Sequence, residues 1–279
     1  MVRRYSRTEI RERLRKILDA GKPIVGAAAG TGISAVGAEQ GQADLIIIYN
    51  SGRYRMAGRG SLAGLMPYGD ANAIVVELAA EVLPIVKQTP VLAGVCGTDP
   101  FRIMSKFLRE LKDWDFSGVQ NFPTVGLIDG NFRANLEETG MSYQKDVDMI
   151  RQANELDLFT TPYVFNPQEA ENMAKAGADL IVAHMGLTSK GLIGAKTTLT
   201  ISEAAERTQQ IIDAARKVNP KILALTHGGP VAEVEDFKYI LEHVRGVQGF
   251  FGATTFERLP VEKAIPTAVR AFKALTFQA

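Results

Sequence analysis

Two of the three histidines, His184 and His227, end two short apolar runs, DLIVAHM (179–185) and KILALTH (221–227). If these runs are neighbouring parallel strands, their ends lie about 4.8 Å apart, and both imidazoles can reach one ligand or metal ion. Imidazole acts as a general acid, a general base or a metal ligand near neutral pH. We therefore expect His184 and His227 to be catalytic, with simple strand capping as the alternative. His243, within LEHVRG, is expected to be a solvated or packing residue.

Glycine-rich ends of other apolar runs are candidates for binding an anion. THGGP (226–230) and FGATT (251–255) follow the last two runs, where barrel enzymes often hold a phosphate on backbone N–H groups. AGTGIS (29–34) follows the first run. We expect an anion to be bound by Gly30, Thr31, Gly228, Gly229, Gly252 and Thr254. The alternative for the glycine pair is a tight turn.

The connection YNSGRYRMAGRGSLAGLMPYGDAN (49–72) is long for a compact domain and shows almost no helix signal before Asp70. It starts where the run ADLIIIY ends, so we expect a lid over the site. A guanidinium binds carboxylate or phosphate through two parallel hydrogen bonds. Arg53 lies nearest the strand end and is the expected anion clamp, with Ser51 beside it, whereas Arg55 and Arg59 are expected to be solvated.

The remaining candidates are carboxylates and the single cysteine. Cys96 and Asp99, in CGTDP, follow the third apolar run and are candidate catalytic residues. Their alternatives are buried packing for the thiol and a helix N-cap for Asp99, because Pro100 follows it. Asp70 and Asp99 are the carboxylates available for a divalent cation, and an N-cap is the alternative for Asp70 as well. Glu257 is a candidate substrate-binding residue or half of a surface ion pair with Arg258.

These residues need a scaffold that brings strand ends together. Eight strand-length apolar runs alternate with amphipathic stretches, and continuous hydrophobicity is typical of parallel strands buried on both faces. The runs span residues 23–29, 44–49, 90–96, 118–122, 157–164, 179–185, 221–227 and 247–253. Eight strand–helix units favour an α/β fold, a (β/α)8 TIM barrel, over an open doubly wound sheet, because no G-x-G-x-x-G follows the first run.

Helix signals support the same organisation. Ser6 with Glu9 predicts an extra N-terminal helix within residues 1–21, ahead of a barrel over 23–279. Asn166-Pro167 and Thr200 with Glu203 predict two further helix starts, and a last helix is expected from about residue 260 to 275. No linker or low-complexity tract divides the chain, so 1–279 is interpreted as one domain.

Composition limits the partners. Net charge is +1, with 32 basic and 31 acidic residues, so neither nucleic acid nor a membrane is an expected partner, and any anion site must be local. One cysteine among 279 residues indicates a reducing, cytoplasmic location, and no apolar stretch is long enough to span a bilayer. We expect a small anionic metabolite as ligand, and a homo-oligomer.

Several segments together resemble the phosphoenolpyruvate hydrolase-like family, also known as TIM-barrel signal-transduction proteins. The segments are VGAAAGTGISA, the connection 49–72, AGVCGTDPF, GVQNFPTVGLIDG, AHMGLTSKG, THGGP and GATTFERLP. The resemblance covers essentially the whole chain. It implies a barrel distantly similar to the phosphoenolpyruvate mutase, phosphonopyruvate hydrolase and isocitrate lyase group, whose members bind an α-keto acid or its enolate on Mg²⁺.

The resemblance predicts an enzyme that hydrolyses or cleaves a small α-keto acid or phospho- or phosphono-carboxylate, with a divalent cation, Mg²⁺, as cofactor. The sequence lacks the Asp-x-Asp pair and the K-K-C-G-H-type loop of that group, and CGTDP supplies Asp99 alone. A barrel that senses such a metabolite without turning it over is therefore the alternative function.

Overall fold

The computed structural model describes residues 4–277, and its centre is one parallel β-sheet. The strands are β1 (Ile24–Ala28), β2 (Leu45–Ile48), β3 (Val91–Val95), β4 (Gly118–Asn121), β5 (Phe159–Thr160), β6 (Tyr163–Val164), β7 (Leu180–His184), β8 (Leu223–His227) and β9 (Gly249–Gly252). Most strand residues are buried, as expected for strands covered on both faces.

The sheet curls so that its two edges nearly meet. Its strand order is β5-β4-β3-β2-β1-β9-β8-β7-β6, and the outermost strands β5 and β6 are separated in the chain only by Thr161 and Pro162. The fifth expected run, 157–164, is thus two short strands, of which β5 pairs with β4 and β6 pairs with β7. Proline has no N–H to donate to a sheet, which accounts for a break at this position.

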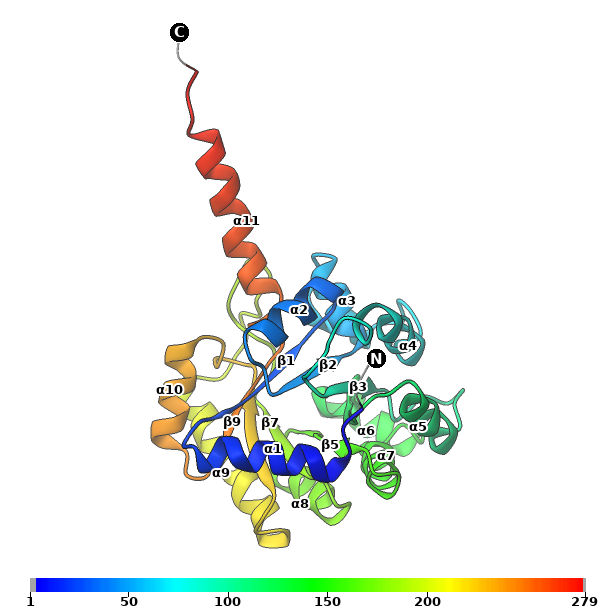
Figure 1. Cartoon of the computed structure of the whole chain (residues 1–279). Helices are drawn as coiled ribbons and strands as arrows, with labels where there is room; N and C mark the ends of the chain where they lie inside the picture. Colours follow the sequence, from blue (N-terminus) through cyan, green and yellow to red (C-terminus); the bar gives the residue numbers. More distant parts are fainter. Residues whose placement is uncertain (1–3, 278–279) are drawn as a thin grey trace.

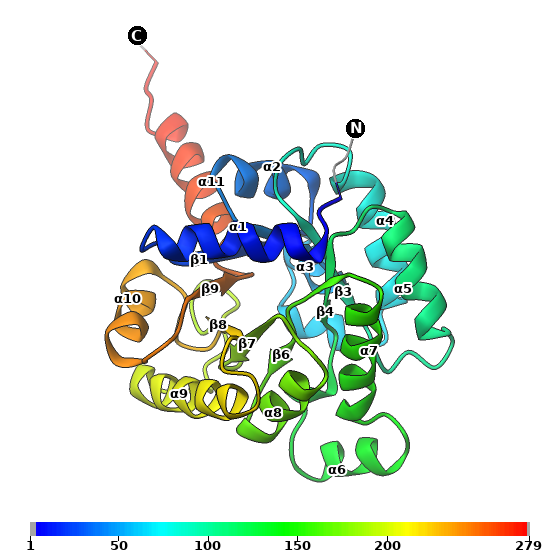
Figure 2. The same cartoon turned by 60° about the horizontal axis from the view of Figure 1, so that its bottom comes forward.

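Helices surround the sheet (Figure 1). They are α1 (Arg7–Asp19), α2 (Gly32–Gln40), α3 (Asn50–Met56), α4 (Ala71–Val82), α5 (Met104–Asp113), α6 (Gly130–Glu138), α7 (Tyr143–Glu155), α8 (Pro167–Lys175), α9 (Ile201–Val218), α10 (Val234–His243) and α11 (Arg258–Lys273), with 3-10 turns η1 (Ser61–Leu65) and η2 (Val125–Leu127). Helix α1 precedes β1 and lies across one end of the sheet (Figure 2).

The predicted helix starts are confirmed. Ser6 and Glu9 form a reciprocal capping box at α1, and Thr200 and Glu203 form one at α9. Asn166 caps α8 with a proline in its first turn. These side chains satisfy N–H groups that the first turn of a helix leaves without backbone partners. Asp70 caps α4 by accepting a hydrogen bond from the Ala73 N–H.

The connection after β2 is more ordered than its sequence indicates. Helix α3 begins directly after the strand, and η1 follows, so the expected irregular stretch before Asp70 is wrong. Asn50 and Ser51 are buried and bind backbone carbonyls of the η1 segment, Gly64 and Ser61 respectively. No side chain caps the first turn of α3. The sequence therefore carries no N-cap signal that would predict this helix.

Helix α11 projects away from the sheet (Figure 1). Of its residues only Arg258 and Leu259 are buried. Apolar side chains farther along are exposed: Val261, Ile265, Val269 and Phe272, the last with 78% of its surface exposed. No helix in the described part of the chain is both long and apolar enough to cross a membrane.

Candidate functional site

A small cavity, here called the mouth cavity, lies at the C-terminal ends of the strands. Its wall includes Tyr49, Arg55, Ser61, Leu62, Phe122, Leu127, Tyr163, His184, Gly186, Leu187, Thr188, His227, Ala253 and Thr254. In parallel barrels the loops at this end carry the chemistry. Its volume is about 20 Å³, which is room for about one water molecule. The cavity is therefore closed over by η1 and by the loop after β7.

The structure brings the two predicted histidines together. His184 pairs with His227 in the register of β7 and β8, and their ring centroids are 4.6 Å apart. His184 Nδ1 accepts a hydrogen bond from the Gly186 N–H (3.0 Å), so the neutral ring carries its proton on Nε2. His227 Nδ1 lies 2.6 Å from the Phe251 carbonyl oxygen, which only accepts, so Nδ1 carries the proton and Nε2 has the free lone pair.

Both rings are neutral at physiological pH. Burial lowers the pKa of His227 to about 4, with the Arg55 charge acting in the same direction against the hydrogen bond to Phe251. Burial, with His227 beside it, lowers the pKa of His184 well below its ordinary value. Within residues 4–277 neither Nε2 has a hydrogen-bond partner. The pair therefore offers one N–H donor and one basic nitrogen side by side.

Arg55 and Glu257 form a buried ion pair beside the histidines. The Arg55 Nε donates to Glu257 Oε2 at 2.6 Å, and Nη2 contacts the same oxygen. Their side chains are 1% and 0% exposed. Burial alone would lower the pKa of the guanidinium, but the Glu257 carboxylate outweighs it and raises that pKa, so Arg55 stays charged. Arg55 also donates to Ser61 Oγ (3.2 Å) and lies over the Tyr49 ring.

Tyr163, which we call the floor of the mouth cavity, lines it and packs against both histidines. Its ring centroid is 4.8 Å from that of His184 and 4.8 Å from that of His227. Its backbone is held on both sides, because its N–H donates to Asn121 Oδ1 (2.7 Å) and its carbonyl accepts from the Tyr143 hydroxyl (2.5 Å). The floor of the cavity is thus fixed by β4 and α7.

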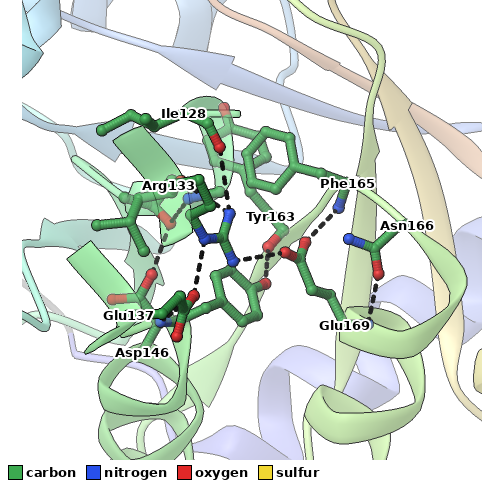
Figure 3. Close-up of polar contacts among 12 residues, drawn as sticks. Ile128, Arg133, Glu137, Asp146, Tyr163, Phe165, Asn166 and Glu169 are labelled. Carbon is green, nitrogen blue, oxygen red and sulfur yellow. Dashed lines mark hydrogen bonds and ion pairs between the residues drawn. The ribbon is translucent and has the colours of Figure 1, made fainter. Parts of the chain in front are cut away.

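Arg133 ties together the loops around this floor (Figure 3). Its Nη1 donates to the Val125 carbonyl at 2.9 Å, and its Nη2 donates to Glu169 Oε1 at 3.1 Å. Glu169 Oε2 in turn accepts from the Phe165 N–H, directly after β6. The Phe165 ring packs on His184, with centroids 4.8 Å apart. A guanidinium on α6 therefore links the loop after β4 to the end of β6.

Asp146 is a buried carboxyl group near the same loops. Its Oδ2 accepts hydrogen bonds from Thr124 Oγ1 (2.6 Å) and Asn121 Nδ2 (3.3 Å). Burial raises its pKa to about 7, against the lowering effect of these two hydrogen bonds. The sequence did not single out Asp146, because it lies on a helix rather than at a strand end.

The arginine assignments within 49–72 differ from expectation. Arg53 is partly exposed and pairs with Glu77 of α4, outside the mouth cavity, whereas Arg55 lines it. The expectation that Arg55 is solvated is wrong. Residues two apart on a helix point in nearly opposite directions, so once α3 forms, only one of the two arginines can face the cavity. Arg59 is exposed and binds carbonyls of its own loop.

Cys96, Asp70 and Asp99 lie apart from the histidines, along an open, mainly apolar groove of about 650 Å³. Burial raises the pKa of the Cys96 thiol to about 11, so it is not a thiolate at neutral pH. Asp99 is not an N-cap, because α5 begins at Met104; it accepts from the Phe101 N–H instead.

Asp70 and Asp99 do not fit a resident divalent cation. Arg102 pairs with Asp70 Oδ2 (3.1 Å) and with Asp99 Oδ2 (3.2 Å), and Asn72 Nδ2 donates to the same Asp99 oxygen. The two carboxylates therefore already share a cation. Across residues 4–277, no group of three or more His, Cys, Asp and Glu side chains could hold a metal ion.

Most of the other residues predicted to bind an anion have a role in the backbone structure instead: a helix cap, a close backbone contact or a tight turn. Thr31 caps α2. Gly30 packs against Gly52, where an added Cβ would lie 2.1 Å from the Gly52 backbone. Gly228 and Gly229 have positive φ angles of 74° and 60°, and the Gly229 N–H donates to the Gly186 carbonyl.

Thr254 lines the mouth cavity, whereas Ser51 and Gly252 lie outside its wall. Glu257 pairs with Arg55, while Arg258 pairs with Glu262 instead. Tyr49 and Tyr163 also line the cavity, although the sequence analysis gave neither a role. The available signals were the position of Tyr49 directly after β2 and that of Tyr163 near the end of the run 157–164.

The curled parallel sheet, with its cavity at the C-terminal strand ends, is a fold that this chain shares with a solved phosphomutase and a solved hydrolase. Phosphoenolpyruvate phosphomutase from Streptomyces platensis subsp. rosaceus superposes with a TM-score of 0.61 at 14% identity, covering 94% of this chain and 87% of that one. Phosphonopyruvate hydrolase in complex with oxalate and Mg²⁺ superposes with a TM-score of 0.57 at 15% identity, covering 95% and 87%. At these identities the likeness is one of fold.

The sequence gives a narrower assignment. The profile of the family described as "Phosphoenolpyruvate hydrolase-like" matches residues 9–275, and the chain belongs to that family. Two tomato (Solanum lycopersicum) proteins, "ToMV susceptible protein tm-1(GCR26)" and "ToMV resistance protein Tm-1(GCR237)", are each 57% identical over 98% of this chain. The chain spans 36% of the length of each.

Proposed function

We propose that the chain is an enzyme that acts on a small anionic α-keto acid, or on a phospho- or phosphono-carboxylate, at the mouth cavity. The observation that carries the proposal is the pair of neutral imidazoles with opposite tautomers. In this assignment His184 Nε2–H donates a hydrogen bond to the substrate carbonyl oxygen, where negative charge develops. His227 Nε2 accepts a proton from substrate or from an attacking water.

The surroundings support this division of roles. Burial keeps both rings neutral, so the Nε2 lone pair of His227 stays free to accept a proton, while His184 keeps its proton on Nε2. Arg55 is the cation that the described cavity wall contains, and its guanidinium is the group suited to a substrate carboxylate or phosphate. Glu257 keeps Arg55 in place, since its Oε2 accepts from Nε.

The test is pyruvate release from phosphoenolpyruvate and from phosphonopyruvate, with added Mg²⁺ and with EDTA. We expect turnover by the wild type and a loss of about 10²- to 10⁴-fold in kcat for His227→Ala, the range for removing a general base. No turnover on either substrate, from folded protein, contradicts the proposal. The comparison of rates with Mg²⁺ and with EDTA tests the expected Mg²⁺ dependence. The roles proposed for His184 and His227 do not involve the metal ion.

A metabolite-binding barrel without turnover is the second candidate. It is favoured by the Arg102 bridge, which occupies the two carboxylates expected to hold a cation. The tomato relatives also carry names that describe susceptibility and resistance to ToMV rather than a reaction. Under this alternative, calorimetry detects oxalate or pyruvate binding that is lost in His227→Ala, while no product forms. If the protein is instead an enzyme, His227→Ala keeps ligand binding and loses catalytic rate.

We take the scaffold to be a (β/α)8 barrel with an added N-terminal helix, in which β5 and β6 count as one interrupted strand. We also propose that the chain forms a homo-oligomer. The exposed apolar side chains of α11 support this, because a contiguous apolar surface is typical of an association site. The cytoplasmic location indicated by the single cysteine stays a prediction.

A further inference from the structure

A second cavity, of about 380 Å³, lies at the opposite end of the sheet from the histidines. We call it the basal cavity. Its wall combines the α1 helix with residues that precede β7 and β8, and Figure 2 shows α1 crossing this end of the sheet. Its charged side chains are the cations Arg7, Arg11, Arg15 and Lys221 and the acids Glu12 and Asp179.

One of the two acids is fully engaged. The Asp179 side chain is 1% exposed, and both of its oxygens lie 2.8 Å from Arg7 Nε. Asp179 Oδ2 also accepts from the Thr160 N–H and hydroxyl, each at 3.1 Å. Arg11 Nε is farther away, at 3.8 Å. Asp179 therefore neutralises Arg7 and contributes little to balancing the remaining cations.

Two of the remaining cations, Arg15 and Lys221, face the cavity without a matching acid. Arg7, Arg11 and Arg15 are spaced four residues apart and so lie on one face of α1. Arg15 and Lys221 are exposed, and neither has a carboxylate within 4 Å among the described residues. Glu12 is the one acid of the cavity wall, as described, that Arg7 does not engage. The basal cavity is therefore a concave site with unneutralised positive charge, in a protein whose net charge is only +1.

We propose that the basal cavity binds a small metabolite that carries a phosphate or diphosphate group. Guanidinium groups match the geometry of phosphate oxygens, and an ammonium such as that of Lys221 adds a point charge. The volume lies in the range of small-molecule pockets. The site is separate from the mouth cavity, since β7 and β8 run between the two for five residues each, or roughly 13 Å.

The experiment is isothermal titration of the full chain with inorganic pyrophosphate, and separately with inorganic phosphate, at low ionic strength. We expect one site per chain. Arg15→Gln and Lys221→Gln each weaken binding by about five- to tenfold, because each removes a charge-assisted contact. Glu12→Gln strengthens binding, since it removes the opposing charge. The matched control is Arg109→Gln, on the exposed face of α5, which leaves affinity unchanged.

The His227→Ala variant separates this proposal from the proposed function. Its affinity for pyrophosphate equals that of the wild type if the anion binds at the basal cavity, whether or not the mouth cavity is catalytic. The proposal is overturned by an absence of binding. It is also overturned if Arg109→Gln weakens binding as much as Arg15→Gln, or if His227→Ala abolishes binding while Arg15→Gln and Lys221→Gln do not affect it.

Discussion

His184 and His227 lie ring beside ring in adjacent strands, yet their backbone contacts give them opposite tautomers. The Gly186 N–H fixes the proton of His184 on Nε2, and the Phe251 carbonyl fixes that of His227 on Nδ1. Two identical side chains at matching register positions thereby become a donor and an acceptor. The difference arises from the backbone that follows each strand, not from the residues themselves.

Burial of His227 makes stability depend on pH. The pKa of His227 is about 4 in the folded chain and 6.5 ordinarily, so the unfolded state binds the proton first as the pH falls. Stability is therefore lost between about pH 6.5 and pH 4. Relative to a His227→Gln variant, the wild type should lose on the order of 2 kcal/mol of unfolding free energy between pH 7 and pH 5. Urea unfolding at both pH values measures it, and a constant difference between the two proteins contradicts it.

Titration of Asp146 should make stability depend on pH in the opposite direction. Its folded pKa of about 7 exceeds its ordinary value of 3.8, so the folded chain holds the proton more tightly, and stability falls as the pH rises from about 4 to 7. Asp146→Asn keeps an oxygen acceptor for Thr124 and removes the titration. The unfolding free energy of the variant, taken relative to that of the wild type, should rise by on the order of 3 kcal/mol between pH 4.5 and pH 8. Urea unfolding at these two values tests this, and a gain that is absent or reversed rules it out.

The Arg55–Glu257 pair should show strong coupling. Removing one partner leaves an uncompensated buried charge, so Arg55→Met and Glu257→Leu should each cost about 3–5 kcal/mol. The double variant should cost much less than the sum of the two. Chemical unfolding of all four proteins gives the coupling free energy. Arg53→Gln, at a partly exposed pair, is the matched control and should change stability by about 0.5 kcal/mol or less.

Arg133 should control the order of the loop after β4. Lysine retains the charge but lacks the fork that reaches the Val125 carbonyl and Glu169 together. Arg133→Lys should therefore cost about 1–2 kcal/mol and speed amide exchange at residues 125–128. Hydrogen exchange with mass spectrometry measures this. Arg151→Lys, whose partner Asp148 is on the surface, is the control; equal acceleration in both variants would contradict the assignment.

The sequence predicts the scaffold well because strand and cap signals are local. The eight apolar runs and the boxes at Ser6 and Thr200 depend on residues within a few positions of one another. The meeting of His184 and His227 was predictable for the same reason, since register follows from two strand ends. The split between β5 and β6 was not predicted, although Pro162 within the run 157–164 is a local signal of a strand break.

The side-chain partners depend on contacts distant in sequence and were not predictable. Arg55 and Glu257 are 202 residues apart, and nothing near either residue indicates the other. The choice between Arg53 and Arg55 requires the rotation of α3, a helix whose start lacks a side-chain cap. Asp70 and Asp99 looked like free carboxylates because the orientation of Arg102, between them in space, cannot be read from the chain.

The small volume of the mouth cavity has a kinetic consequence. A space of about 20 Å³ does not admit an α-keto acid, so η1 or the loop after β7 must move before any ligand enters. In rapid mixing, the observed rate of ligand association should rise with concentration and then level off at the rate of that opening. Shortening the side chain of Leu62, which covers the cavity and is itself 44% exposed, should raise the plateau.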